Sequence, residues 1–155
     1  SGGDLKIVAT ECGIKDTFVV AYGDVVTDID VSSLVKKHSK GTLATVALFE
    51  VPLKDISKFG SVAFDGDAIT KFVEKPKEGE APSNVANACY FVIEPSLLEH
   101  IPNGKSKLEI DTFPKLAEQS KLKGVKCTPS MGIDVGTLKS YWRANRMAEL
   151  MLPPE

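Results

Sequence analysis

Two aspartates, Asp24 and Asp134, stand where a carboxylate can do chemistry. Asp24 follows the apolar run Thr17–Ala21, and Asp134 lies in the segment Gly132–Thr137, so both acids have glycine close by. Glycine lets the backbone approach a ligand closely. Two carboxylates, completed by substrate phosphates and water, form a typical Mg²⁺ shell, because magnesium seldom receives an all-protein cage. The pair is therefore a candidate magnesium site.

A third segment, Phe72–Lys77, supplies Glu74 and Lys75 held against a proline. Lysine presents a compact point charge that suits phosphate. Each of the three segments can also be a plain structural turn, and an aspartate after a strand can cap the next helix. Asp24 lies beyond the carboxyl end of its strand, where open α/β sheets bind ligands. Considered alone, Asp24 fits a helix cap and a ligand-binding carboxylate equally well. The polar groups of the other two segments favour the ligand-binding role.

The first half of the chain predicts a helix, a strand, a helix and a strand. Apolar residues recur at helical spacing over 5–12, after a glycine-rich lead at Ser1–Gly3 that can hold an anion or be a flexible terminus. A buried strand, covered on both faces, is expected over 17–21. A helix capped by Asp30 or Ser32 runs to residue 38, and a second buried strand covers 43–49.

The second half adds a hairpin, a strand and three helices. Strands at 61–64 and 68–73 flank Asp65-Gly66-Asp67, a strong hairpin signal, and another strand covers 86–93. A short helix opens at Pro95, a longer one covers 110–119, and the last runs from 138 to 151, between a Thr137 cap and Pro153-Pro154. This order predicts a mixed sheet, parallel in its early part with an antiparallel excursion.

Composition predicts one domain spanning residues 1–155 and excludes several classes of function. The chain is 43% apolar and 26% charged, with a net charge of −2 and no block of basic residues, so no nucleic-acid partner is expected. No apolar run reaches the roughly 20 residues of a membrane span, which argues against a membrane partner. The charged run Lys77–Glu80 is expected to be a solvated loop.

The cysteines and histidines predict no further chemistry. Cys12, Cys89 and Cys127 are odd in number, widely spaced and set among apolar residues, so buried free thiols in a reducing cytoplasm are expected. His38 and His100 have no nucleophile or carboxylate at a suggestive spacing. Both are interpreted as structural or solvated.

The ordered set of motifs resembles the sugar-1-phosphate nucleotidylyltransferases, over nearly the whole chain. That family shows a glycine-rich helix start, a strand ending in GD, FGxV before a hairpin, an FxEKP loop, an N-A-G-type strand and a D-x-G-T turn. Any one of these is weak, and the order is the strong signal. Here they appear as Ser1–Leu5, Gly23-Asp24, Phe59–Val62, Phe72–Pro76, Asn87–Cys89 and Asp134–Thr137.

The resemblance implies a three-layer α/β/α, Rossmann-like fold with a mixed sheet, and transfer of a nucleotidyl group from a nucleoside triphosphate to a sugar 1-phosphate. Asp24, Lys75 and Asp134 would be catalytic, with the two aspartates holding Mg²⁺. Substrate binding would fall to four further residues: Gly3 at the nucleotide base, Gly23 at the turn, and Glu74 and Asn87 at the sugar 1-phosphate.

Three departures from the family pattern matter. The G-x-G-T-R phosphate loop, with the first βα units of the sheet, is absent from these 155 residues, so the chain is interpreted as a partial domain, inactive alone. Cys89 replaces a usual glycine, and Gly132 a common aromatic. Truncation, proteolysis or a split enzyme with a partner polypeptide would each fit, as would a homo-oligomer. The alternative is a non-catalytic homologue that binds a sugar phosphate or nucleotide-sugar as a regulatory or scaffold subunit.

Overall fold

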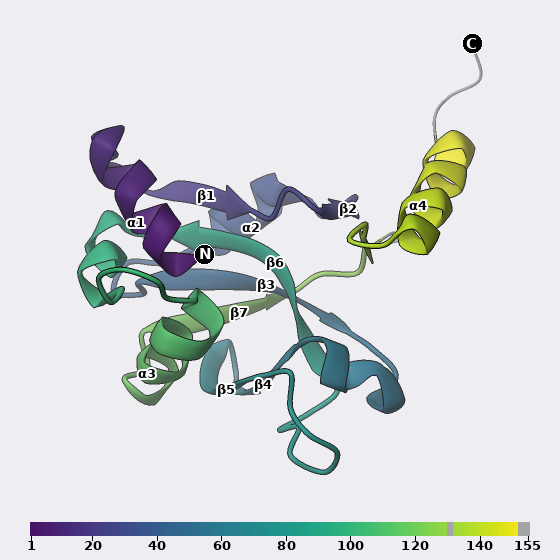
Figure 1. The fold of residues 1–155 in the computed structure, drawn as a ribbon. Coiled ribbons are helices and arrows are strands. Elements are labelled where there is room, and N and C mark those ends of the chain that lie inside the picture. The colour runs from purple at the N-terminus through teal and green to yellow at the C-terminus, as the bar shows by residue number, and fades with distance from the viewer. Residues whose placement is uncertain (130–131, 152–155) are drawn as a thin grey trace.

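A six-stranded sheet forms the centre of the computed structural model, which describes residues 1–129 and 132–151 (Figure 1). A separate two-stranded ribbon pairs β2 (Val25–Thr27) with β8 (Gly132–Asp134). The six strands lie in the order β1 (Phe18–Ala21), β6 (Val85–Ile93), β3 (Ala44–Glu50), β7 (Leu122–Lys126), β5 (Ala68–Glu74) and β4 (Gly60–Asp65).

The sheet is mixed, as the sequence predicts, but its early strands do not pair with each other. β6 lies between β1 and β3 and is antiparallel to both. β3 and β7 form a parallel pair. β4 and β5 form the predicted hairpin, with Asp65 opposite Ala68 and Gly66 at a φ of +59°. The early strands β1 and β3 thus run in the same direction, but they are not the parallel pair expected, because β6 from later in the chain inserts between them.

Helices cover both faces of the sheet and make three layers. On one face, α1 (Gly2–Glu11), the 3₁₀ turn Pro95–His100 and α3 (Phe113–Glu118) pack on the main apolar core. On the other face, Leu34 of α2 (Val31–Lys37) packs against alternate residues of β3, β6 and β7. The period-2 alternation of side chains along a strand explains how one strand feeds both cores.

The helix ends follow capping rules. Ser1 caps α1, with its hydroxyl accepting from the Asp4 amide, so the helix begins three residues before the expected start. Asp30, rather than Ser32, caps α2 by accepting from the Ser33 amide at 3.0 Å. Thr137 caps α4 (Leu138–Met151) by accepting from the Ser140 amide at 3.1 Å. The predicted stop at Pro153-Pro154 lies outside the described residues.

Several elements were not expected from the sequence, and the ribbon strands β2 and β8 are two of them. β7 reads Leu-Lys-Gly-Val-Lys, whose charges mask a central strand. A 3₁₀ turn occupies Leu53–Lys58. The helix expected over 110–119 instead starts at Leu108 with one turn of π-helix, Leu108–Thr112, before α3. Its predicted inner face is confirmed, since Phe113, Leu116 and Ala117 are buried.

Two burial predictions are wrong. β1 is an edge strand with Val19 40% exposed, so it is not covered on both faces. Cys12 is exposed at the end of α1, although all three cysteines are free.

His38 is structural, with its ring nitrogens 2.7 Å from Thr45 Oγ1 and 2.9 Å from Glu94 Oε1. None of the described helices is long and apolar enough to cross a bilayer.

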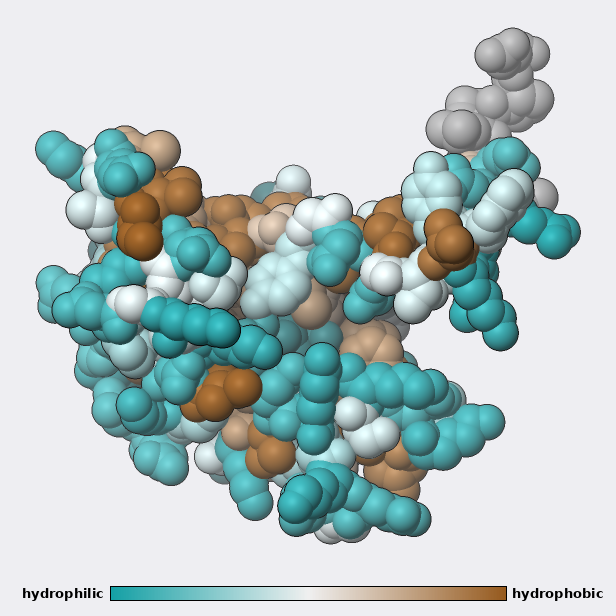
Figure 2. Space-filling model, in the orientation of Figure 1, coloured by the Kyte–Doolittle hydropathy of each residue, from teal (hydrophilic) through white to brown (hydrophobic). Residues whose placement is uncertain are grey.

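Exposed apolar side chains gather along one side of the molecule. Figure 2 shows hydrophobic surface over α1, on the side that also carries β1, β2 and α4 in Figure 1. Of the ten large apolar side chains described as exposed, eight belong to these elements and to α2: Ile7, Val8, Val19, Val26, Val35, Leu138, Tyr141 and Trp142. This side is unlike the well-packed centre of the sheet.

Close packing at β7 gives a test of the central sheet. A Cβ added at Gly124 would lie 2.5 Å from Leu48 Cδ1 and 3.2 Å from Ile69 Cγ1. We expect Gly124→Ala to lower the free energy of unfolding by about 1–3 kcal/mol, measured by urea denaturation. Gly132→Ala is the matched control, because nothing lies within 4 Å of its added Cβ. Equal losses in the two variants would contradict the packing described.

Candidate active site

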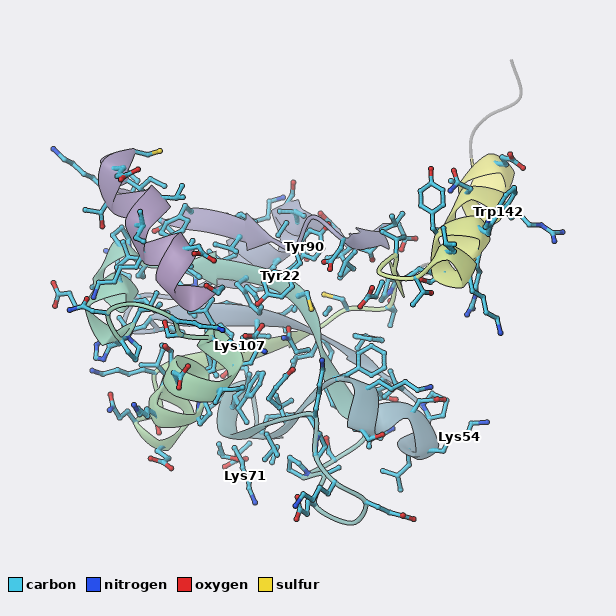
Figure 3. All side chains as sticks on the ribbon, viewed as in Figure 1. Tyr22, Lys54, Lys71, Tyr90, Lys107 and Trp142 are labelled. Atoms are coloured by element: carbon cyan, nitrogen blue, oxygen red, sulfur yellow. The ribbon has the colours of Figure 1, made fainter. Side chains whose placement is uncertain are left out.

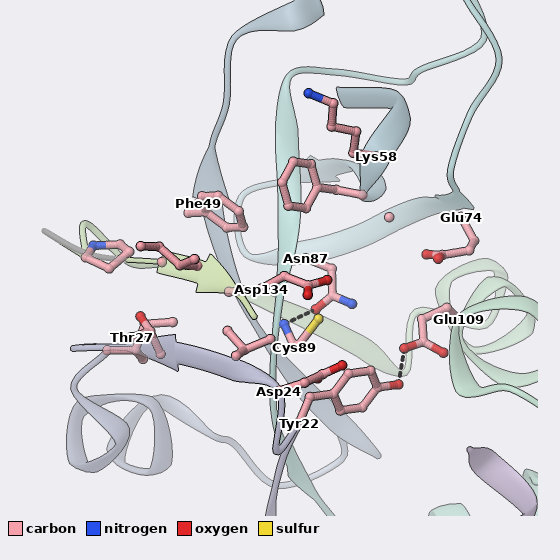
Figure 4. Close-up of a pocket in the computed structure, with 18 of the residues that line it drawn as sticks. Tyr22, Asp24, Thr27, Phe49, Lys58, Glu74, Asn87, Cys89, Glu109 and Asp134 are labelled. Atoms are coloured by element: carbon pink, nitrogen blue, oxygen red, sulfur yellow. Dashed lines mark hydrogen bonds between the residues drawn. The ribbon is translucent and has the colours of Figure 1, made fainter. Parts of the chain in front are cut away.

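A cavity of about 250 Å³ opens between the β2–β8 ribbon, β6 and the end of β5 (Figure 4). Its lining combines carboxylates, lysines, an amide, aromatic rings and a thiol. Five of the residues singled out from the sequence meet there, although they come from separate parts of the chain: Asp24, Glu74, Lys75, Asn87 and Asp134.

The β2–β8 ribbon brings the two aspartates together. Val25 pairs with Asp134 in the antiparallel ladder, and the Val135 amide donates to the Asp24 carbonyl at 2.8 Å. Both carboxylates line the same cavity, and Figure 4 shows them facing the same space. A short ladder that the sequence did not predict thus connects the two predicted acids.

The D-x-G-T turn fixes the orientation of Asp134. Its Oδ1 accepts a hydrogen bond from the Gly136 amide at 2.7 Å. A Cβ at Gly136 would lie 2.9 Å from that oxygen, so only glycine leaves room for the fold-back. The next residue, Thr137, then caps α4, so the motif serves the carboxylate and the helix together.

Glu74 and Lys75 stand at the end of β5 in a constrained backbone. Lys75 has a φ of +46°, and its amide donates to the Phe59 carbonyl at 3.0 Å. A Cβ at Gly60 would lie 2.8 Å from Glu74 Oε2, which explains the glycine of the F-G-x-V motif. Non-glycine residues at positive φ concentrate at functional sites. The second such residue at this cavity is Cys89.

A bulge in β6 turns Asn87 and Cys89 toward the cavity. The register with β3 shifts between Val46 and Leu48, and Cys89 adopts a φ of +61°. Its amide donates to Asn87 Oδ1 at 2.8 Å, and the Asn87 amide nitrogen points into the cavity (Figure 4). A left-handed residue within a strand is a position that favours glycine. This explains physically why cysteine is the unusual residue at this place.

Two lining residues, Tyr22 and Glu109, were given no role from the sequence. The Tyr22 hydroxyl donates a short hydrogen bond to Glu109 Oε1. Figure 3 shows Tyr22 beneath β1, and its ring packs edge-on against Phe91 with centroids 5.7 Å apart. Glu109 belongs to the π-helical turn and is 8% exposed. In the sequence Glu109 lies between Lys107 and Asp111, in a segment where charged and apolar residues alternate, so this acid does not stand out.

The cavity carries more negative than positive charge. Burial, and then the nearby Glu109 carboxylate, raise the pKa of Glu74 above its usual value. Burial, followed by the surrounding carboxylates, raises the pKa of the Cys89 thiol to about 12. Burial and the bond to Glu109 also raise the pKa of Tyr22. A thiol held protonated in this way is a poor nucleophile, so Cys89 is not a candidate for covalent chemistry.

Two glycines predicted to bind substrate lie apart from the cavity lining. Gly3 packs against the loop at Gly104, whose carbonyl oxygen would lie 2.0 Å from an added Cβ. Its lack of a side chain is thus explained by close packing between α1 and that loop. Gly23 is exposed between Tyr22 and Asp24, with nothing within 4 Å of an added Cβ.

The acids present fit a magnesium ion that is shared with substrate. Asp24 and Asp134 offer hard oxygen ligands side by side, as Mg²⁺ requires. No group of three or more His, Cys, Asp or Glu side chains suited to a metal occurs in residues 1–129 and 132–151. A two-carboxylate set is typical of magnesium held by carboxylates and substrate phosphates together.

Fold and cavity define an α/β protein with a carboxylate-rich pocket at one edge of its sheet, and comparison with known proteins gives its family. The family model described as "Nucleotidyl transferase" matches residues 5–149. The chain belongs to this family, and its curated relatives carry names of sugar-1-phosphate nucleotidyltransferases.

Two relatives and one solved structure illustrate the match. A UTP–glucose-1-phosphate uridylyltransferase of Synechocystis is 35% identical, with 94% of this chain and 38% of that protein covered. A putative mannose-1-phosphate guanyltransferase of Sulfolobus acidocaldarius is 33% identical, with coverage of 92% and 38%. The fold matches a UDP-glucose pyrophosphorylase from Acinetobacter baumannii with a TM-score of 0.83 at 21% identity, over 99% of this chain and 57% of that one. The chain thus spans about two fifths of these curated relatives.

The raised pKa of Glu74 gives a stability prediction with a definite sign. A carboxyl with a higher pKa in the folded than in the unfolded state costs stability as pH rises through that interval. We expect Glu74→Gln to raise Tm by about 2 °C at pH 7, a modest gain because solvent screens this half-exposed group. The gain should vanish near about pH 3, where both states are protonated.

Glu118→Gln, on the exposed side of α3, is the control for that experiment. It should leave Tm unchanged at both pH values. A Glu74→Gln variant that is less stable at pH 7, as measured by differential scanning calorimetry, would show that the carboxylate is stabilised rather than strained by its surroundings.

Proposed function

We propose that this chain is the sugar-binding and metal-binding part of a sugar-1-phosphate nucleotidyltransferase. The reaction would be in-line attack by a phosphate oxygen of the sugar 1-phosphate on the α-phosphorus of a nucleoside triphosphate. The bond from the α-phosphorus to the bridging oxygen breaks, pyrophosphate leaves, and a nucleoside diphosphate sugar forms. Because the nucleophile already carries negative charge, the reaction demands no general base.

The observation that carries the proposal is the meeting of Asp24 and Asp134 with Glu74, Lys75 and Asn87 around one cavity. Asp24 and Asp134 would hold Mg²⁺, which neutralises phosphate charge as it develops. Lys75 would attract the phosphate of the sugar 1-phosphate as a point charge. Asn87, with its oxygen held by the Cys89 amide, is free to donate through its nitrogen. These groups position charge rather than move protons.

The remaining predictions extend this proposal. Gly23 would let the substrate approach the turn beside Asp24, and Gly3 would lie near the nucleotide base. We place the protein in the cytoplasm, in keeping with its three free cysteines. We further propose that the chain is inactive without a G-x-G-T-R loop, whether that loop comes from an upstream segment, a partner polypeptide or a second copy.

Pyrophosphate exchange tests the proposal directly. The assay combines sugar 1-phosphate, nucleoside triphosphate and Mg²⁺ with this chain, and with a version extended at its amino end by the phosphate-loop segment of a relative. We expect exchange in the extended version alone. No exchange in either version, with both folded by circular dichroism, would favour a non-catalytic sugar-phosphate-binding subunit. Exchange in the short chain would refute the need for the added loop.

The two aspartates can be tested one at a time. We expect Asp24→Asn and Asp134→Asn, each in the extended version, to lower Mg²⁺-dependent kcat/KM by roughly 100-fold, because each removes a charged metal ligand. Thermal unfolding should change little, since both side chains are exposed. Asp16→Asn, an exposed acid outside the cavity, is the control. Near-normal turnover in both variants would exclude a shared metal site.

The loop after Lys75 provides a complementary negative prediction. Lys77, Glu78 and Glu80 are exposed, as the sequence predicts, and lie outside the cavity lining. We expect their replacement by alanine to change the free energy of unfolding by less than about 0.5 kcal/mol. The change in kcat/KM should correspond to a similarly small energy, roughly twofold or less. A larger loss of turnover would mean that this loop touches the substrate.

A further inference from the structure

We propose that Glu109 is a specificity-determining residue that accepts hydrogen bonds from the sugar hydroxyls, with Tyr22 as its positioning residue. This inference rests on the proposed function, because it concerns the sugar end of the same cavity. Glu74 alone was assigned to the sugar from the sequence. The structure places a second, more deeply buried carboxylate beside it.

Glu109 is held ready for a ligand rather than used up by the fold. It is 8% exposed, yet it lines the cavity, and the Tyr22 hydroxyl occupies only one of its oxygens (Figure 4). A carboxylate offers about four acceptor positions. The neighbouring Asp111 accepts from the Lys107 amide at 2.7 Å, so backbone stabilisation of this turn falls to Asp111. Glu109 is therefore free for recognition.

The local backbone also points to recognition. Glu109 lies in a single turn of π-helix, Leu108–Thr112, and such turns are frequent at functional sites. Tyr22 comes from the turn after β1, on the opposite wall of the cavity, and its ring is fixed against Phe91. A tyrosine held in this way orients the carboxylate across the cavity.

The charge around Glu109 selects the ligand chemistry. Glu74 and Glu109 repel each other, and neither forms an ion pair within 4 Å in the described part of the chain. A buried carboxylate needs hydrogen-bond donors or a cation. An uncharged sugar ring offers several hydroxyl donors, and hydrogen bonds to an ionised acceptor are strong. The pair therefore fits a neutral polyhydroxyl ring and disfavours an anionic sugar.

Calorimetric titration with a series of sugars tests the inference. The parent ligand is whichever of glucose 1-phosphate and mannose 1-phosphate binds more tightly, measured on this chain and on the extended version. Its 2-, 3-, 4- and 6-deoxy forms and inorganic phosphate complete the set. We expect Glu109→Gln to weaken the parent by roughly 10- to 100-fold and inorganic phosphate by less than about twofold.

The deoxy series separates recognition from a structural role. The sugar that lacks the hydroxyl bound by Glu109 should bind equally well to wild type and to Glu109→Gln. For every other deoxy sugar, the two proteins should differ in affinity by the same factor as for the parent ligand. Tyr22→Phe should cost about 2- to 10-fold on the parent, because the carboxylate remains but loses its anchor. Glu118→Gln, on the exposed side of α3, should bind like wild type.

A charged sugar gives a second readout. We expect wild type to bind glucuronic acid 1-phosphate more weakly than glucose 1-phosphate, and Glu109→Gln to narrow that gap by removing one of two repelling charges. A gap that does not change would contradict the assignment of Glu109 to the sugar ring.

The outcomes are distinguishable. If neither version of the wild type prefers a sugar 1-phosphate over inorganic phosphate, the proposed function is wrong and the inference falls with it. If wild type shows the preference and Glu109→Gln keeps it within twofold, the function stands and the role of Glu109 is refuted. Equal losses on every sugar, with a lowered Tm, would assign Glu109 to folding and also refute it.

Discussion

The backbone hydrogen bonds of β6 hold the molecule together, because this strand pairs with β1 on one side and β3 on the other and touches β4 at Ala86. Both apolar cores therefore share it. The same strand bulges at Cys89, where pairing with β3 is interrupted. The bulge opens onto the cavity, which side chains from the β2–β8 ribbon, the end of β5 and the π-helical turn also border.

Charge within that opening is the second organising constraint. Four carboxylates and two lysines line it, so the cavity favours a ligand that brings a cation or hydroxyl donors. At the ribbon, two acids line the same space, and such a pair suits a cation that is shared with a phosphate ligand. Near the π-helical turn, the carboxylates of Glu74 and Glu109 repel each other, and hydrogen bonds from uncharged donors would stabilise both. The cavity thus has two ends with different chemical demands.

Much of the site could be predicted because its groups sit next to backbone constraints that leave a trace in sequence. Asp134 needs Gly136, and Glu74 needs Gly60, since a Cβ at either glycine would crowd the carboxylate. Strands with continuous apolar residues, such as β3, were equally visible. β7 was missed because Lys121, Lys123 and Lys126 lie in or beside this short strand. Its Gly124, where Leu48 and Ile69 leave no room for a side chain, adds no apolar signal.

Glu109 was invisible for a different reason. Its position depends on a tertiary partner, Tyr22, that lies 87 residues away in sequence. Periodicity also misled there, because a π-helical turn breaks the 3.6-residue spacing on which helix prediction depends. The burial predicted for β1 was also wrong. Its apolar residues match the pattern of a buried strand, although β1 lies at the edge of the sheet.

The π-helical turn has an evolutionary consequence. Such a turn holds one residue more than an α-helical turn, so a single-codon deletion within Leu108–Thr112 would restore ordinary helix. The residues before the deletion would then rotate by about 100° relative to α3, which would carry Glu109 off the wall of the cavity. A relative could therefore gain or lose a sugar-facing acid through one insertion or deletion, with every other residue of the pocket unchanged.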